Sequence, residues 1–144
     1  MARVHKSVLV AHPVACMRGL VEDVPSYPQF LPWCGGAEVR EQQGDVTVAS
    51  VTINFHGVRQ AFTTRNTRQS PERIDIALVD GPFRSLEGHW SFLPLGDEGC
   101  RVELVLEYDF SSSLLERLIG PVFARIADSL VDAFVTRADA LAGQ

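Results

Sequence analysis

The sequence lacks several features that would assign a protein class at once. Its three cysteines, Cys16, Cys34 and Cys100, are odd in number and share no C-x-x-C spacing, so neither a disulfide framework nor a zinc site is expected. No apolar run approaches the ~20 residues that span a bilayer. The start of the chain has only a short apolar run before His12 and Pro13, too little for a signal peptide. We therefore expect a cytoplasmic protein with reduced thiols.

Clustered positive charge is also scarce. The formal net charge is −5 at pH 7, and phosphate contacts need grouped lysine and arginine, so neither general nucleic-acid binding nor DNA binding is expected. One local exception is a modest basic strip formed by Arg59, Arg65 and Arg73, which is a candidate RNA-binding site. Ordinary solubilising charge, paired with nearby acids, is the alternative interpretation of the same residues.

Motifs of covalent, phosphate or cofactor chemistry are absent as well. The sequence contains no G-x-S-x-G, no P-loop, no dinucleotide fingerprint and no H-E-x-x-H. Glu87 and His89 share one face of a predicted strand, but Trp90 and Phe92 mark the opposite face as the buried one, so we expect this pair in solvent. We predict no enzyme activity, no catalytic residue, no metal and no cofactor.

What the chain does contain fits one globular domain, residues 1–144. Its length of 144 residues, with 46% hydrophobic and 22% charged residues, suffices for a sizeable core. Residues 3–10 alternate between apolar and polar and predict a strand. Pro13 suits the first position of a short amphipathic helix, and we interpret Glu22 and Asp23 as its water-facing end.

The segment SYPQFLPWC, residues 26–34, combines bulky apolar side chains with prolines. Pro28 and Pro32, together with the preceding Pro25, forbid a long helix, which predicts a stiff loop or a single helical turn. Its apolar side chains must cover a core, close over a cavity or meet a partner. We interpret this proline loop as the gate of a cavity.

Beyond the proline loop the apolar period changes to two. Short Gly-, Asp- and Asn-containing connections indicate antiparallel hairpins. In the last strand Leu104 and Tyr108 face one way and Glu103 and Glu107 the other, which predicts one dry and one wet sheet face. The predicted strands are residues 37–42, 46–55, 58–67, 73–79, 83–93 and 101–110.

From about Ser113 a long amphipathic helix is predicted, with a kink expected at Pro121. The fold class is thus α+β, a helix-grip arrangement in which a curved antiparallel sheet of about seven strands wraps around the C-terminal helix, with short helical structure between the first two strands. The gap between sheet and helix favours an apolar cavity, a filled core being the alternative. The helix's apolar stripe is Leu115, Leu118, Ile119, Val122, Phe123, Ile126, Leu130, Phe134 and Ala138.

Four segments together resemble the coenzyme-Q-binding START-like family, which includes the RatA-type bacterial proteins. They are SYPQFLPWC (26–34), FTTRN (62–66), LVDGPFRSLEGHWSF (78–92) and GPVFARIADSLVDAFVTRA (120–138), so the resemblance covers nearly the whole chain. It implies a helix-grip fold with a hydrophobic tunnel, a polyprenylated quinone such as ubiquinone or another lipid as ligand, and no catalysis. By position it implies that the proline loop forms the tunnel mouth.

The resemblance leaves two roles open. The role we favour is non-enzymatic quinone binding in support of respiratory electron transport, with a transient contact at the inner membrane. The other is that of a toxin that binds the large ribosomal subunit and blocks subunit association. An aromatase or cyclase is a third possibility, which would need polar groups such as Thr64, Asn66 and Tyr108 aimed into the cavity. The predicted ligand-binding residues are Tyr27, Phe30, Leu31, Trp33, Phe62, Phe83, Trp90, Leu104, Leu106, Val122, Phe123, Ile126, Leu130 and Phe134.

Overall fold

The computed structural model describes residues 2–143, which form one seven-stranded antiparallel sheet and three helical segments. All predicted strands are present, with ends that differ by a few residues. The helical segments are α1 (Val14–Glu22), the 3-10 helix η1 (Val24–Gln29) and α2 (Ser113–Ala142). The strands are β1 (Ala2–Val10), β2 (Cys34–Gln43), β3 (Val46–Phe55), β4 (Val58–Ser70), β5 (Arg73–Asp80), β6 (Phe83–Pro94) and β7 (Cys100–Phe110).

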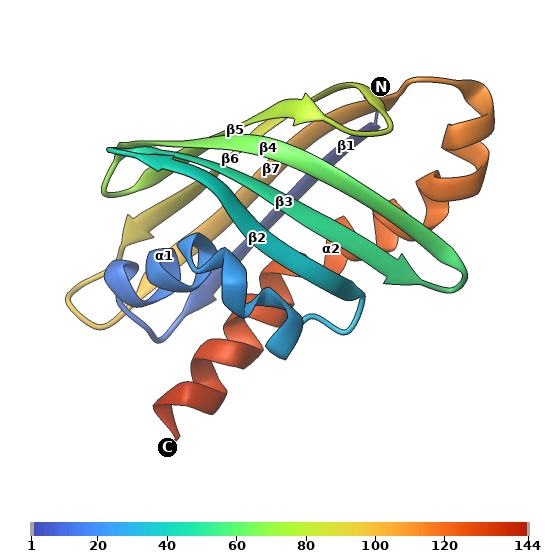
Figure 1. Ribbon diagram of the computed structural model, residues 1–144. Helices are drawn as coiled ribbons and strands as arrows, with labels where there is room; N and C mark the ends of the chain where they lie inside the picture. Colours follow the sequence, from blue (N-terminus) through green and yellow to red (C-terminus); the bar gives the residue numbers. More distant parts are fainter. Residues whose placement is uncertain (1, 144) are drawn as a thin grey trace.

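The sheet follows the chain from β2 to β7 and then adds the first strand. Its order is β1-β7-β6-β5-β4-β3-β2, with β1 beside β7 in a register that pairs Val4 with Leu106. Figure 1 shows the strands curving over α2, while α1 and η1 lie beside the lower end of the same concave side. The α+β helix-grip fold predicted from the sequence is therefore confirmed.

Strand β7 forms the middle of the buried face. The inward side chains of Leu104 and Tyr108 are 0% and 3% exposed, and their neighbours Val102, Leu106 and Phe110 are buried with them. Because β7 has strands on both sides and α2 below, this face receives no water. The predicted division into one dry and one wet face is confirmed for this strand.

Helix α2 begins as the sequence predicts. The Ser112 side chain caps it by accepting a hydrogen bond from the Leu115 backbone N–H at 3.1 Å. Pro121 lies inside the helix, where it has no N–H to donate to the preceding turn, and the first turns of α2 run in a different direction from the rest (Figure 1). The helix stripe that faces the sheet is Ile119, Phe123, Ile126, Ala127, Val131, Phe134 and Ala138.

The prediction that Leu118 belongs to this buried stripe is wrong. Leu118 is 59% exposed, because a residue directly before Ile119 is rotated by about 100° away from the buried side of the helix. Leu115, Val122 and Leu130 are half-buried at the margins of the stripe. The buried stripe is thus narrower than the apolar pattern.

Two polar contacts fasten α2 to the rest of the molecule. The His12 Nε2 atom, just after β1, lies 2.6 Å from an Asp139 carboxylate oxygen near the helix end. The Lys6 ammonium of edge strand β1 lies 3.8 Å from Asp132 and 3.9 Å from Asp128. These contacts hold the C-terminal half of α2 beside the open edge of the sheet.

Candidate ligand-binding cavity

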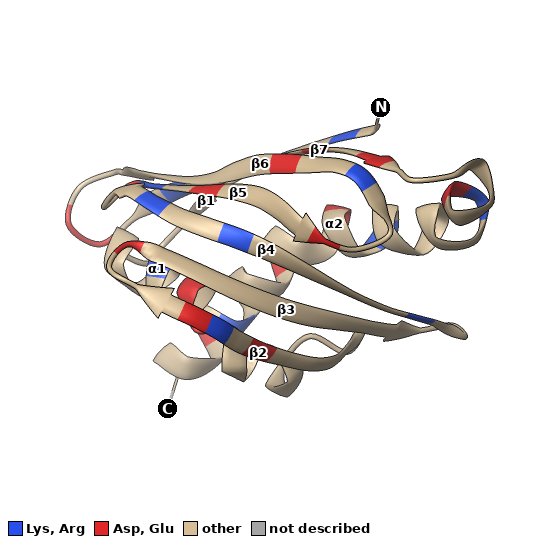
Figure 2. Cartoon of the chain, turned by 45° about the horizontal axis from the view of Figure 1, so that its top comes forward, with Lys and Arg blue, Asp and Glu red and all other residues tan. Residues whose placement is uncertain are grey.

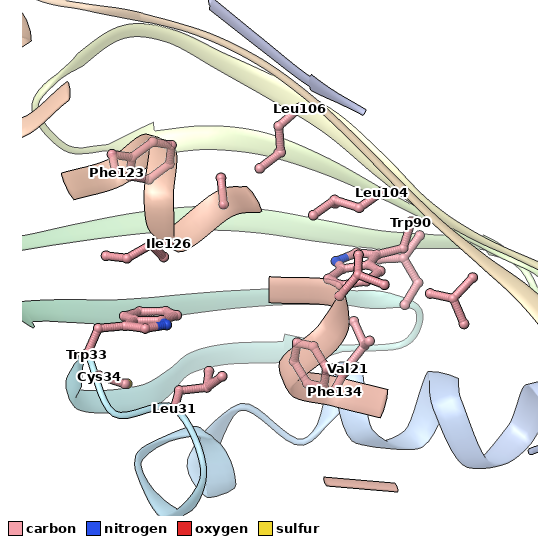
Figure 3. Close-up of a cluster of buried hydrophobic side chains, with 14 of the residues drawn as sticks. Val21, Leu31, Trp33, Cys34, Trp90, Leu104, Leu106, Phe123, Ile126 and Phe134 are labelled. Atoms are coloured by element: carbon pink, nitrogen blue, oxygen red, sulfur yellow. The ribbon is translucent and has the colours of Figure 1, made fainter. Parts of the chain in front are cut away.

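A cavity of about 130 Å³ lies between the concave face of the sheet and α2. Around it, side chains from the sheet, from α2 and from the segment before β2 converge, including Trp90, Leu104, Phe123 and Ile126 (Figure 3). Most of the lining is apolar. The cavity is therefore a place where a small apolar molecule could be enclosed.

Most of the residues predicted to bind a ligand line this cavity, and their role in binding stays a prediction. They come from α2, the inward faces of the strands and the proline loop. Inward residues of β3 and β5 that the prediction did not include, such as Val51 and Ile76, also line it, and their period-two pattern could have identified them. The predicted residues in the lining are Tyr27, Trp33, Phe62, Trp90, Leu104, Leu106, Phe123, Ile126, Leu130 and Phe134.

Four predicted residues lie elsewhere. Phe30 packs against the Phe134 ring at 5.3 Å, outside the lining, and Leu31 is 1% exposed within the core. Phe83 stacks on Phe110 at 5.0 Å, where an aromatic group fills one end of the interior. Val122 is half-buried at the edge of the α2 stripe. Side-chain direction within each element, which the apolar pattern does not define, separates these residues from the cavity.

The proline loop covers the core and closes one side of the cavity. Its first half lies in η1, a 3-10 helix of six residues and thus about two turns, slightly longer than the predicted single turn. The Tyr27 ring packs edge-on against Phe134 at 5.5 Å. The Tyr27 hydroxyl donates a hydrogen bond to the Val21 carbonyl oxygen. Burial, helped by the nearby charge of Asp23, raises the pKa of Tyr27, so its phenol stays neutral and presents an apolar ring to the cavity.

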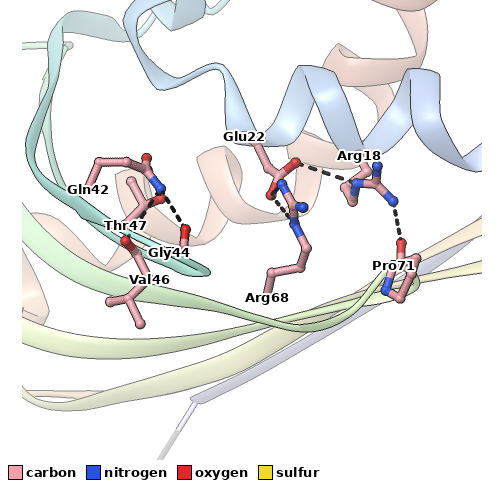
Figure 4. A network of polar contacts seen from close by, with 8 residues as sticks. All are labelled: Arg18, Glu22, Gln42, Gly44, Val46, Thr47, Arg68 and Pro71. Atoms are coloured by element: carbon pink, nitrogen blue, oxygen red, sulfur yellow. Dashed lines mark hydrogen bonds and ion pairs between the residues drawn. The ribbon is translucent and has the colours of Figure 1, made fainter.

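The polar part of the lining is the largest departure from the sequence prediction. Glu22 is not a solvent-facing helix end: its carboxylate accepts hydrogen bonds from Arg68 Nη2 and Nε at 2.7 and 2.8 Å. Arg18 Nε lies 3.5 Å from the same carboxylate, and Arg18 Nη1 donates to the Pro71 carbonyl oxygen at 2.8 Å (Figure 4). This network ties α1 to β4 and to the β4–β5 turn across one end of the cavity.

Of the inward polar groups expected from sequence, two line the cavity. Thr64 is 9% exposed and donates to the Asn66 side-chain oxygen at 3.1 Å, and both belong to the lining. Tyr108 does not: it is buried in the aromatic group beside Phe83 and Phe123, where burial raises its pKa. The cavity therefore has few groups for acid–base chemistry.

The predicted basic strip is only partly continuous. Since Phe62, Thr64 and Asn66 face the cavity, Arg59 and Arg65 project from the convex side of β4. The adjacent strand β3 carries no charged residue. Arg73, unlike Arg59 and Arg65, forms an ion pair, with its Nε atom 2.8 Å from the Asp75 carboxylate.

The convex face also carries acidic groups, some of them close to these arginines. Figure 2 shows acidic positions on β5, the strand next to β4, and on β6. Glu87 and His89 occupy the face opposite Leu86 and Trp90, and Asp75 sits directly across from His89 in the strand register. Within residues 2–143, no group of three or more His, Cys, Asp or Glu side chains is arranged to hold a metal ion. In the same range, no helix has both the length and the apolar character to cross a bilayer.

The size of the cavity limits what it could hold. Its volume of about 130 Å³ is close to that of an engineered cavity that takes up benzene, and below the ~300 Å³ of the smallest common ligand pockets. One six-membered ring or one isoprenoid unit matches this space. A whole polyprenylquinone would need the interior to open further.

A curved sheet that grips a long helix around an apolar cavity defines a START-like, helix-grip protein. The solved structure of a START superfamily protein from Mycobacterium smegmatis matches it with a TM-score of 0.83 at 21% identity, over 96% of this chain and 98% of that one. The chain belongs to the family described as polyketide cyclase / dehydrase and lipid transport, whose model matches residues 10–135.

Two curated relatives carry different names. The ribosome association toxin RatA of Vibrio cholerae is 42% identical over 144 residues, all of both chains. The mitochondrial coenzyme Q-binding protein COQ10 homolog B of Xenopus laevis is 26% identical over 96% of this chain and 59% of its own length. The predicted resemblance to the family that contains both is confirmed.

Proposed function

We propose that this chain associates with the ribosome and acts as a toxin of protein synthesis. The supporting observation is the 42% identity over the full length to a protein named ribosome association toxin. The finer hypothesis is that the chain binds the large subunit and blocks its association with the small one, which would place it in the cytoplasm. No chemical step is needed for this role.

The convex side of β4 is the candidate contact surface. Strand β4 carries Arg59, Arg65 and Arg68 and no carboxylate, so all of its charges are positive. Arg68 is bound to Glu22 on the other face, which leaves Arg59 and Arg65 about 20 Å apart along the outer face. Two phosphate contacts at this spacing would make association about tenfold weaker when salt rises fourfold.

Co-sedimentation through a sucrose gradient tests this proposal. The tagged chain, expressed in a bacterial host, is expected in the large-subunit fractions at low salt. The double variant Arg59→Glu/Arg65→Glu is expected to be absent from those fractions. The matched control is Arg101→Glu/Arg117→Glu, which changes the net charge equally at exposed positions elsewhere. A chain that never sediments with ribosomal particles contradicts the proposal. Loss of sedimentation in both double variants contradicts only the β4 surface.

The cavity favours a second candidate function, the non-enzymatic binding of a hydrophobic ligand of the quinone class. Its support is the mostly apolar lining, together with a relative named coenzyme Q-binding protein. Burial of a ring in such a space gains roughly 0.8 kcal/mol per buried CH₂-sized group. The two candidate functions use opposite faces of the sheet, so they are compatible with one another.

Native mass spectrometry of the freshly purified protein tests the second candidate. We expect an added mass that is extractable as a quinone or lipid, or uptake of a short-chain quinone by the empty protein. Protein that is empty and also ignores added quinone contradicts this function. From the sequence alone, Phe123→Arg would be expected to abolish ligand binding in a folded domain. It is unsuitable as a test, because Phe123 is 3% exposed among four aromatic rings and a charge there would unfold the domain.

A further inference from the structure

The cavity has a polar end, where Arg68 and Glu22 reach solvent, and an apolar end near Phe123. Along β4 the inward side chains change from Phe62 through Thr64 and Asn66 to Arg68. The side chain of Arg68 is 40% exposed and that of its partner Glu22 is 30% exposed. At the apolar end Phe123 is 3% exposed. The Arg68 end is therefore the mouth.

Asn66 and Arg68, both polar residues of the lining at this end, carry hydrogen-bond donors that the protein does not use. Thr64 donates to Asn66 Oδ1, so the Asn66 Nδ2 group has no partner within residues 2–143. Arg68 uses Nε and Nη2 for the Glu22 carboxylate, which leaves the N–H groups of Nη1 without a partner in the same part of the chain. Both donors belong to residues that line the cavity.

We propose that the mouth is the binding site for the carbonyl oxygen of a compact cyclic ketone or quinone, which accepts hydrogen bonds from Arg68 and Asn66 while its ring occupies the apolar interior. This inference rests on the second candidate function. Donors at the edge of a water-poor space favour a ligand that brings an acceptor, since burying a donor unpaired costs free energy. The volume of about 130 Å³ suits one ring.

Glu22 sets the charge of this site. Its carboxylate orients the Arg68 guanidinium and also lies beside Arg18, and Asp45 is a second acid in the lining, so the two positive charges at the mouth are balanced by two negative ones. A neutral carbonyl is therefore favoured over a carboxylate or phosphate, which would compete with Glu22 for the same N–H groups. The Glu22–Arg68 pair also joins α1 to the sheet, so a ligand that enters at the mouth must pass beside that pair.

A shape-matched ligand pair tests the proposal. Duroquinone and durene share a tetramethylated six-membered ring, but only duroquinone has carbonyl oxygens, and its full substitution prevents addition of cysteine thiols. Binding of each to the intact chain is measured by equilibrium dialysis with chromatographic quantification. We expect Arg68→Met to weaken duroquinone about tenfold and Asn66→Ala to weaken it several-fold, with durene binding unchanged in both.

Controls separate the possible failures. Arg101→Met removes a guanidinium in the same way at an exposed position outside the lining, so it should leave both affinities unchanged. Durene binding by each variant reports that the fold and cavity are intact. If Arg68→Met does not fold because Glu22 loses its partner, the double variant Glu22→Met/Arg68→Met removes both charges and should weaken duroquinone in the same way. Equal losses of duroquinone and durene, or no loss of duroquinone, overturn the carbonyl site. If neither compound binds the wild-type chain, the second candidate function itself fails.

Discussion

At the scale of single residues, one glycine determines how closely two central strands approach. Gly88 of β6 pairs with Leu106 of β7, and a Cβ added to it would lie 2.0 Å from the Val105 carbonyl oxygen. A backbone carbonyl group cannot move aside to relieve such a clash as the end of a flexible side chain could. This position therefore requires glycine for reasons of space.

We expect Gly88→Ala to destabilise the fold by roughly 3 kcal/mol, because β6 and β7 must separate to admit the methyl group. The matched control is Gly19→Ala in α1, where an added Cβ meets no atom within 4 Å and alanine should stabilise the helix by roughly 0.5–1 kcal/mol. Urea unfolding measures both. A neutral Gly88→Ala would show that the two strands leave room for a methyl group.

A second residue-scale feature is the acid dependence carried by Glu103. A hydrogen bond with His5 at 2.9 Å lowers the pKa of Glu103, although partial burial acts in the opposite direction. Since the folded pKa lies below that of the unfolded chain, ionised Glu103 stabilises the fold above the unfolded pKa. That contribution is lost as the pH falls through the folded pKa.

Glu103→Gln mimics the protonated acid and tests this linkage. At about pH 6 we expect the variant to be less stable than the wild type by up to roughly 1 kcal/mol, since His5 is half exposed and solvent weakens the pair. The difference should shrink between about pH 5 and pH 3. Glu41→Gln, at an exposed position, should show no such pH dependence. A pH-independent difference for Glu103→Gln would contradict a lowered pKa of Glu103 in the folded chain.

At the scale of elements, helix α2 shows what a periodic pattern can and cannot define. Its start at Ser113, its length and its buried face were predictable, because a stripe at helical spacing must meet the sheet. The width of the buried stripe could not be predicted from the sequence. Leu114 and Leu118 are each 59% exposed, since only one narrow side of the helix reaches the curved sheet. Shape, rather than hydrophobicity, decides which leucines are covered.

Truncation of α2 side chains should follow this division. Phe134 is 1% exposed and contacts Tyr27, Phe30 and Trp90, so Phe134→Ala should destabilise the fold by roughly 3–5 kcal/mol. Leu118→Ala should change the free energy of unfolding by less than about 0.5 kcal/mol. Chemical denaturation of both variants makes the comparison. Similar losses of stability in both variants would mean that Leu118, in the first turns of α2, is buried against other residues.

At the scale of the whole molecule, the curved sheet separates two surfaces. Its concave side holds the cavity, and its convex side carries Arg59 and Arg65. The resemblance to the coenzyme-Q-binding START-like family could be identified from sequence motifs and is confirmed. The motifs do not choose between ribosome association and ligand binding, because each role would use a different side of the same sheet.

Filling the cavity tests whether the interior is open. Ala49 of β3 is 2% exposed and lines the cavity, so Ala49→Ile should fill part of its volume and stabilise the empty protein by about 1 kcal/mol. The same variant should lose duroquinone and durene binding. Thermal and urea unfolding report the stability. Destabilisation by overpacking would show that the space is already filled by side chains.

The sequence by itself determined the element order, the dry face of the sheet and the apolar face of α2, because period-two and helical patterns depend on local geometry alone. Only the tertiary structure decided that Glu22 turns inward to Arg68 and that Phe83 fills the core. These outcomes depend on which side chains from distant strands and helices meet as the sheet curves. A linear pattern carries no information on those distances.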